Sequence, residues 1–304
     1  MNHDGMTITM KEWRKTVLHS LLYVLIILVS HRGVEVRAEV PEEIRVVTYN
    51  IHHGEGMDGK FDLKRIANRL LAVEPHIVAL QEVDQGTRRA GGVDQPAELA
   101  KLTGMEVVFG RNIDFDGGGY GTAVLTKLPV RSHKQVKLKS FYPPTPQNPE
   151  QRGVQVLEIG EKEGPGFLFL NTHLDYRPPD EERMASAKTI NELIANRGDE
   201  PAIIAGDFNA EVGSGSMEEF IKEWRVAGVG PQVESAKPQA AGAKTKATEG
   251  RPPILTFPAD RPEKWIDYVM YRPADKWEVV EVRVLDEGVA SDHRPLLAVV
   301  RRAK

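Results

Sequence analysis

Short apolar runs recur along the chain after residue 40 and predict most of its strands. Residues 44–51 are mostly β-branched or apolar and break into His52-His53-Gly54, which predicts a strand ending in a loop. Residues 61–73 place apolar side chains on one helical face and precede a proline, which predicts a helix. Comparable apolar runs predict strands over 77–80, 167–170, 202–205, 264–271, 278–285 and 295–300.

The remaining segments predict a second helix, a group of paired strands and a loop. Residues 180–197 predict a helix, because three acidic side chains at its first turn complement the helix dipole and Gly198 follows as a C-terminal cap. Residues 105–159 alternate β-like runs with Gly and Pro turns, which predicts a meander. Residues 230–253 have few large apolar groups and predict a mobile loop. The whole pattern predicts a β-rich α/β (α+β) fold of two packed sheets flanked by helices.

Residues 1–38 have the pattern of an export signal. Three basic residues precede an apolar stretch over 17–29, and Val36-Arg37-Ala38 offers the small residues that a signal peptidase prefers. The stretch is shorter than the roughly 20 residues that span a bilayer, so the alternative is an uncleaved anchor that associates with the membrane through residues 17–29. A buried core helix is disfavoured by the charged flanks. Both alternatives predict an exported protein, either secreted or anchored to the outer face of the cytoplasmic membrane.

The composition limits the chemistry that a site in this chain would use. The 304 residues are 40% hydrophobic and 28% charged, which suits a single globular domain. There is no cysteine, so disulfides, thiolate zinc sites and a cysteine nucleophile are excluded. A metal would rest on oxygen and imidazole ligands, which favours Mg²⁺, Mn²⁺ or Ca²⁺. The net charge of -4 gives no overall basic excess and counts weakly against a nuclease.

Polar and imidazole side chains gather where the predicted strands end. Each has an ordinary structural explanation, such as a turn cap for Asn50, a solvated strand end for Glu82 or a hydrogen-bonded structural role for His173. These explanations do not account for five separate strand ends that carry such groups. In a sheet-based enzyme, strand ends are where catalytic side chains collect. The joint occurrence therefore favours one composite site.

Six motifs carry a resemblance to a known family. They are Thr48-Tyr49-Asn50-Ile51, Gln81-Glu82-Val83, Asn171-Thr172-His173-Leu174, Gly206-Asp207-Phe208-Asn209, Ile266-Asp267-Tyr268 and Ser291-Asp292-His293. In this order the motifs resemble the endonuclease/exonuclease/phosphatase (DNase I-like) superfamily, in its bacterial metal-dependent hydrolase branch. The resemblance runs from about residue 43 to the C-terminus and implies a catalytic domain over 39–304. It also implies a four-layered sandwich with the site at one end.

The resemblance implies a role for each matched position. Asn50, Glu82 and Asp292 would hold a hard cation such as Mg²⁺. Asp207 would orient or deprotonate the attacking water, and Asn209 would donate to the phosphate. His173 and His293 would flank the phosphate, with Asp267 paired to one imidazole, by family analogy that of His173.

Two further positions resemble the family less closely. Tyr120 matches a Tyr-Gly-Asn-Ala segment of relatives, but Thr122 stands where Asn is expected. Arg152 resembles a phosphate-facing arginine, although a surface salt bridge would explain an isolated arginine equally well. His52 and His53 follow the first motif and would either reach a second metal or simply be exposed.

These roles together predict a divalent-metal-dependent phosphoesterase that hydrolyses a phosphodiester by in-line attack of a water activated by Asp207. The alternatives for its substrate are nucleic acid, for a secreted DNase I-like endonuclease, and lipid or another small phosphodiester, for a sphingomyelinase-like enzyme. Only Arg88-Arg89 and Lys244 to Lys246 form basic loop clusters that a nuclease would use. A catalytically silent binding module is disfavoured because the acidic and imidazole groups are all present. The sequence indicates no protein partner.

Overall fold

The computed structural model describes residues 40–141, 150–229 and 254–303. The predicted export segment over 1–38 and the predicted mobile loop over 230–253 lie outside the described residues, so both stay predictions. Within the described ranges, none of the helices has the length and apolar character needed to span a bilayer.

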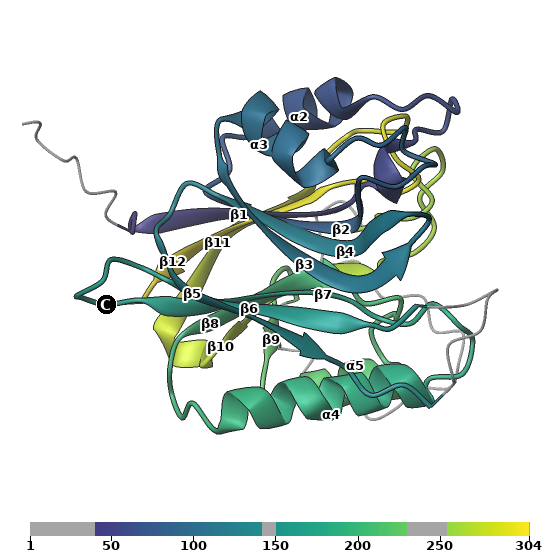
Figure 1. The fold of residues 1–304 in the computed structure, drawn as a ribbon. Coiled ribbons are helices and arrows are strands. Elements are labelled where there is room, and N and C mark those ends of the chain that lie inside the picture. Colours follow the sequence, from purple (N-terminus) through teal and green to yellow (C-terminus); the bar gives the residue numbers. More distant parts are fainter. Residues whose placement is uncertain (1–39, 142–149, 230–253, 304) are drawn as a thin grey trace, which may run out of the picture. The chain divides into compact units, whose positions relative to one another are not determined.

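Two six-stranded sheets form the centre of the fold (Figure 1). The first sheet has the order β11-β12-β1-β2-β4-β3 and the second has the order β5-β6-β7-β8-β10-β9. Each contains one parallel pair, β1 with β2 and β7 with β8, among antiparallel neighbours. The strands of the first sheet are β1 (Glu43–Asn50), β2 (Ile77–Gln85), β3 (Glu106–Phe115), β4 (Gly118–Thr126), β11 (Trp277–Val284) and β12 (Leu296–Arg302). Those of the second are β5 (Val130–Lys137), β6 (Gly153–Ile159), β7 (Phe167–His173), β8 (Ala202–Asp207), β9 (Arg225–Val226) and β10 (Asp267–Arg272).

Helices cover the outer face of each sheet, as Figure 1 shows. The helices over the first sheet are α2 (Leu63–Leu71) and α3 (Gln95–Thr103), and those over the second are α4 (Glu181–Ala195) and α5 (Gly215–Phe220). Two short 3-10 turns, η1 (His52–Gly54) and η3 (Ala274–Lys276), complete the described elements. The predicted sandwich of two mixed sheets flanked by helices is confirmed.

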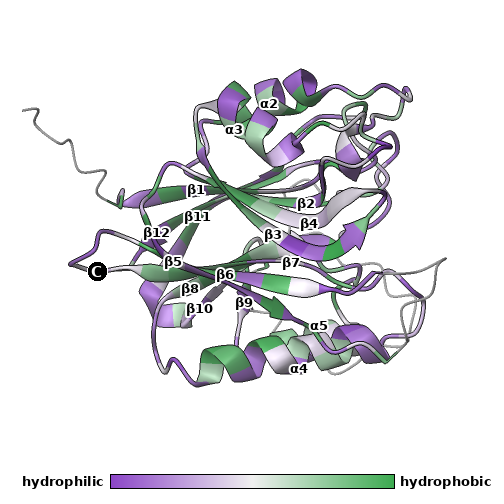
Figure 2. Cartoon of the chain, in the orientation of Figure 1, coloured by the Kyte–Doolittle hydropathy of each residue, from purple (hydrophilic) through white to green (hydrophobic). Residues whose placement is uncertain are grey.

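Successive side chains of β1 are buried on opposite faces of its sheet. Val47 and Tyr49 pack in the core beneath α2 and α3, whereas Ile44 and Val46 pack in the core between the two sheets. Successive side chains of a strand point to opposite faces, so a continuous apolar run suits a strand buried on both sides. Figure 2 shows the same pattern, with apolar residues along the strands and both polar and apolar stripes on α4.

A chain of buried amides links the two sheets beneath their common end. Gln81 Nε2 donates to Asn171 Oδ1 at 2.9 Å, and Asn171 Nδ2 donates to Gln155 Oε1 at 3.1 Å. Thr122 Oγ1 donates to the same Gln155 oxygen at 2.9 Å, so the residue that departs from the family pattern forms an inter-sheet bond. These satisfied polar groups favour one register of the sheets over others.

The structure differs from the sequence prediction in three places. The predicted meander is wrong as a single unit, because β3 pairs with β4 in one sheet and β5 with β6 in the other. Strand β2 continues five residues beyond the predicted end. It pairs with β4 both before and after a bulge between Leu80 and Val83. Elements α3, α5 and β9 were not predicted, because they are short and their apolar periodicity is weak.

Candidate active site

The predicted site residues converge on one end of the two sheets. Asn50, His173 and Asp207 end β1, β7 and β8, and Asp267 begins β10, which runs antiparallel to β8. Asp292 and His293 precede β12, which runs antiparallel to β1 and so starts at the end where β1 finishes. The topology alone therefore brings together groups that lie up to 243 positions apart, from Asn50 to His293.

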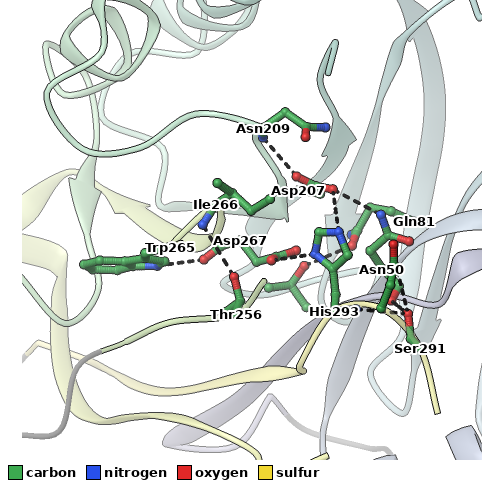
Figure 3. Close-up of polar contacts among 12 residues, drawn as sticks. Asn50, Gln81, Asp207, Asn209, Thr256, Trp265, Ile266, Asp267, Ser291 and His293 are labelled. Carbon is green, nitrogen blue, oxygen red and sulfur yellow. Dashed lines mark hydrogen bonds and ion pairs between the residues drawn. The ribbon is translucent and has the colours of Figure 1, made fainter. Parts of the chain in front are cut away.

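Asp207 lies at the centre of this group (Figure 3). Its Oδ1 accepts a hydrogen bond from the backbone N–H of Asn209 at 2.9 Å, and its Oδ2 accepts one from Asn50 Nδ2 at 3.1 Å. The Nε2 atoms of His173 and His293 lie 3.5 and 3.6 Å from the same Oδ2. Burial and the negative charge of Asp267 raise the pKa of Asp207 to about 7. A carboxylate with that pKa is suited to accepting a proton near neutral pH.

His293 is held by Asp267, which corrects the predicted partner. The Nδ1 atom of His293 lies 2.9 Å from Asp267 Oδ2, whereas the family analogy assigned Asp267 to His173. The pairing follows from the sheet register, because Asp267 stands opposite Asp207 and its side chain reaches the loop before β12. Although burial disfavours the charged ring, Asp267 and Asp207 raise the pKa of His293 to about 10. His293 is therefore an imidazolium that carries a proton on each nitrogen, with Nδ1 donating to Asp267 and Nε2 facing Asp207 at 3.6 Å.

The ring of His173 is neutral, unlike that of His293. Burial, together with the positive charges of Arg152 and His293, lowers its pKa well below the ordinary value of 6.5. Asn209 Nδ2 lies 3.2 Å from His173 Nε2 and also donates to the carbonyl of Leu174 at 3.1 Å. A neutral ring at position 173 accepts the amide hydrogen bond at Nε2 and carries its proton on Nδ1. The amide of Asn209 thus orients His173. The predicted hydrogen bond from Asn209 to phosphate stays a prediction.

Two of the predicted cation ligands, Asn50 and Glu82, are in direct contact, and the negative charge of the third, Asp292, acts on Glu82. Asn50 Nδ2 donates to Glu82 Oε1 at 2.9 Å, and Asn50 is buried at the end of β1. Glu82 lies in the β2 bulge with a left-handed φ of 56°, a strained conformation that aims its side chain towards the site. Burial and the nearby negative charge of Asp292 raise the pKa of Glu82. A hard divalent cation would offset that repulsion, so these carboxylates suit such an ion.

A second acidic group lies beside these ligands and has a different character. Ligand atoms of Asp207, Asp267 and His293 lie within 4.8 Å of one another, which is close enough for a cation. In this group His293 Nδ1 is bonded to Asp267 Oδ2. Of these three residues, His293 and Asp267 are hydrogen-bonded to each other and Asp207 lies 3.6 Å from His293, whereas Asn50, Glu82 and Asp292 remain the predicted cation ligands.

Tyr120 on β4 and Arg152, which directly precedes β6, border the site. Tyr120 is buried, and its pKa is raised well above 10 by burial and by the charges of Glu82 and Glu150, so its hydroxyl stays protonated. Arg152 is 6% exposed and pairs with Glu150 through Nη2 at 2.5 Å. Its Nε and Nη1 have no hydrogen-bond partner within the part of the chain that the structure describes. A buried guanidinium with two open donors is suited to binding phosphate oxygens.

Comparison with known proteins gives the family of the chain. A model of the Endonuclease/Exonuclease/phosphatase family matches residues 47–293. The chain belongs to this family. The uncharacterized protein YbhP of Escherichia coli K12 is 25% identical to it over 268 residues, which cover 84% of this chain and 95% of YbhP.

Solved structures share the fold of this family member. The human nocturnin catalytic domain with bound sulfate superposes with a TM-score of 0.63 at 20% identity, covering 88% of this chain and 97% of that domain. A mannosyl-6-phosphatase from Bacteroides thetaiotaomicron gives a TM-score of 0.62 at 19% identity, covering 86% of this chain and all of its own. At these identities the likeness shows the sandwich fold alone.

Residues beside the predicted site also shape it. Ser291 Oγ donates to the carbonyl of Asn50 at 2.7 Å and so ties the loop before β12 to the end of β1. His52 and His53 have left-handed φ values of 45° and 43°. His53 is not simply exposed, since only 12% of its side chain is accessible and its Nε2 lies 3.3 Å from Glu55. The Ser-Asp-His motif indicates Ser291 in the sequence, whereas the residues around His52 and His53 do not indicate their left-handed backbone.

Proposed function

We propose that the chain is a divalent-metal-dependent phosphoesterase that hydrolyses a phosphodiester by in-line attack of water. The observation that carries the proposal is the placement of Asp207 between a neutral histidine, His173, and a positively charged one, His293, beside the side chains of Glu82 and Asn50. This arrangement combines a proton acceptor, a cationic donor and a cation site within one polar cluster. Each of the three lowers the barrier to hydrolysis of a phosphoester.

The residues supply separate steps of the reaction. Asp207 takes a proton from the water whose oxygen forms the new bond to phosphorus, while the bond from phosphorus to the leaving oxygen breaks. The His293 imidazolium, oriented by Asp267, donates to the charge that develops and supplies a proton to the leaving oxygen. The cation held by Asn50, Glu82 and Asp292 would neutralise negative charge on the phosphate. Arg152 binds a non-bridging phosphate oxygen through its open nitrogens.

A relative with the same fold supports the reaction class. The Bacteroides thetaiotaomicron protein is named a mannosyl-6-phosphatase, which acts on a phosphoester. Because fold alone does not define a substrate, this likeness supports phosphoester chemistry and no particular leaving group.

The electrostatics of the described loops favour a small phosphoester over a nucleic acid. Arg88 pairs with Asp116 at 2.9 Å, and Arg89 pairs with the buried Asp84 at 2.7 Å. Their charges are thus partly neutralised within the protein and contribute less to a phosphate-binding track. A lipid phosphodiester agrees with the proposed export of the protein, whereas a catalytically silent module would leave the buried charges of the site without a use.

The test is a screen of the purified protein against bis-p-nitrophenyl phosphate, plasmid DNA, RNA, sphingomyelin, phosphatidylinositol and inositol phosphates. Each substrate is assayed with Mg²⁺, with Mn²⁺ and with EDTA. We expect metal-dependent turnover of at least one phosphoester and its loss in Asp207→Ala and His293→Ala. Absence of metal-dependent turnover throughout the panel, or variants as active as the wild type, would overturn the proposal.

A further inference from the structure

Tyr176 is an exposed aromatic side chain three residues after His173. It is 58% exposed and stands on the loop that joins β7 to α4. Single exposed aromatics occur on many protein surfaces, so exposure alone does not indicate function. Tyr176 differs from such residues because its loop is anchored and because it lies beside Arg152.

A buried arginine fixes the loop that carries Tyr176. Arg183 from α4 is buried and donates to three carbonyl oxygens of the loop, those of Asp175 at 2.8 Å, Arg177 at 2.5 Å and Pro178 at 3.2 Å. The side chain of Arg177 turns back to Asp175 at 2.8 Å. The backbone on both sides of Tyr176 is therefore anchored, and the ring is presented from a defined position. A preorganised aromatic loses little conformational entropy when a ligand binds.

The ring of Tyr176 lies beside the guanidinium that the site leaves open. The Cζ atom of Arg152 is 5.9 Å from the ring centroid, within the range of a cation–π contact. The Nε and Nη1 donors of Arg152 have no partner in the described ranges. A phosphate oxygen on those donors would place the organic group of the same molecule within reach of the tyrosine face. Aromatic faces bind flat apolar surfaces, which both aryl rings and sugar rings present.

We propose that Tyr176 is a specificity-determining residue that stacks against a ring in the organic part of a phosphoester held by Arg152. The inference rests on the proposed function and adds a substrate class, namely phosphoesters whose organic group contains an aromatic or sugar ring. Small alkyl phosphates lack the surface that Tyr176 would cover. The expected preference for a ring is roughly 3- to 10-fold in affinity, the range of one aromatic stacking contact.

The test measures binding without turnover. Dissociation constants of phenyl phosphate, mannose 6-phosphate and methyl phosphate are determined by calorimetry in EDTA for the full chain and its variants. The wild type binds one or both ring-containing phosphates more tightly than methyl phosphate, and the two arms separate an aromatic from a sugar preference. Tyr176→Phe keeps the preference and Tyr176→Ala removes it, while methyl phosphate binding stays unchanged.

Phe61→Ala is the matched control, because Phe61 is also an exposed aromatic at 50% and stands on the loop before α2. It keeps the ring preference of the wild type. The inference is overturned if wild type shows no preference or no phosphate binding, or if Tyr176→Ala retains the preference. A ring preference that depends on Tyr176 without turnover of any phosphoester would instead overturn the proposed function and leave this binding site in place.

Discussion

Replacing Asp267 by Asn tests the pairing that differs from the family analogy. The side chain of Asp267 is fully buried, and its Oδ2 lies 2.9 Å from His293 Nδ1. Its Oδ1 has no hydrogen-bond partner among the described residues, so the carboxylate is committed to the histidine. Asn has nearly the same shape but no charge. The substitution therefore removes the charge-assisted hydrogen bond while the packing around position 267 is retained.

The structure gives the size of the expected effect. The pKa of His293, raised from 6.5 to about 10, corresponds to about 5 kcal/mol in favour of the imidazolium. Asp267 provides the nearer of the two carboxylates, at 2.9 Å against 3.6 Å for Asp207. An Asp→Asn change behind a catalytic histidine in Ser-His-Asp triads lowers kcat by about 10⁴. We therefore expect Asp267→Asn to lower kcat roughly 10²- to 10⁴-fold, with little change in KM.

The assay is the initial rate of hydrolysis of the best substrate in the panel, with thermal unfolding followed in parallel. Removing the charge of Asp267 leaves the buried His293 without its nearer carboxylate, so the melting temperature falls, and rates are compared at a temperature at which both proteins are folded. Asp275→Asn is the control, since Asp275 is exposed in η3 at the opposite end of β10. A folded Asp267→Asn variant with kcat within about threefold of the wild type would refute this account of the pair.

Three further predictions follow from other contacts. Glu82→Gln raises the Mg²⁺ concentration for half-maximal activity by at least roughly 10-fold, because a charged oxygen ligand is lost; an unchanged Mg²⁺ titration would contradict the assignment. His76 accepts a hydrogen bond from the Arg45 N–H at 3.0 Å, and burial, with Lys127 and Arg45, lowers its pKa. The unfolded chain binds a proton on His76 more readily than the folded one, so the free energy of unfolding of the wild type falls as pH drops below 6.5. In urea unfolding between about pH 7.5 and 5.5, His76→Asn shows a smaller fall of that free energy than the wild type, and equal falls in both proteins would contradict the prediction. Asn171→Ala leaves buried carbonyls of β2 and β4 unpaired and lowers the free energy of unfolding by about 2–4 kcal/mol, whereas a loss under about 1 kcal/mol would show that water satisfies them.

The strand ends that carry the site are predictable from sequence. An apolar run that stops at Asn50, His173 or Asp207 marks both the strand and the polar group at its end, because burial on both faces demands a continuous apolar segment. The order of the six motifs then indicates the family and its sandwich. These features depend on residues close together in the sequence, so they can be predicted without a structure.

The pairing of side chains across the site depends on sheet register. That Asp267 meets His293 follows from its position opposite Asp207 and from the path of the loop before β12, and neither is written in the neighbouring residues. The bulge that aims Glu82 is likewise a consequence of pairing between β2 and β4. The resemblance marks Arg152 as a phosphate-facing arginine, but its burial and its two open donors are visible only in the structure, because an isolated arginine in a sequence is usually a surface residue.

The most direct test of the central claim is the initial rate of bis-p-nitrophenyl phosphate hydrolysis by the wild type and by Asp207→Asn, each in Mg²⁺ and in EDTA. The account predicts turnover by the wild type in Mg²⁺, background rates in EDTA, and a rate roughly 10²- to 10⁴-fold lower for a folded Asp207→Asn variant. Wild-type turnover that persists in EDTA, or an Asp207→Asn variant as fast as the wild type, would contradict it.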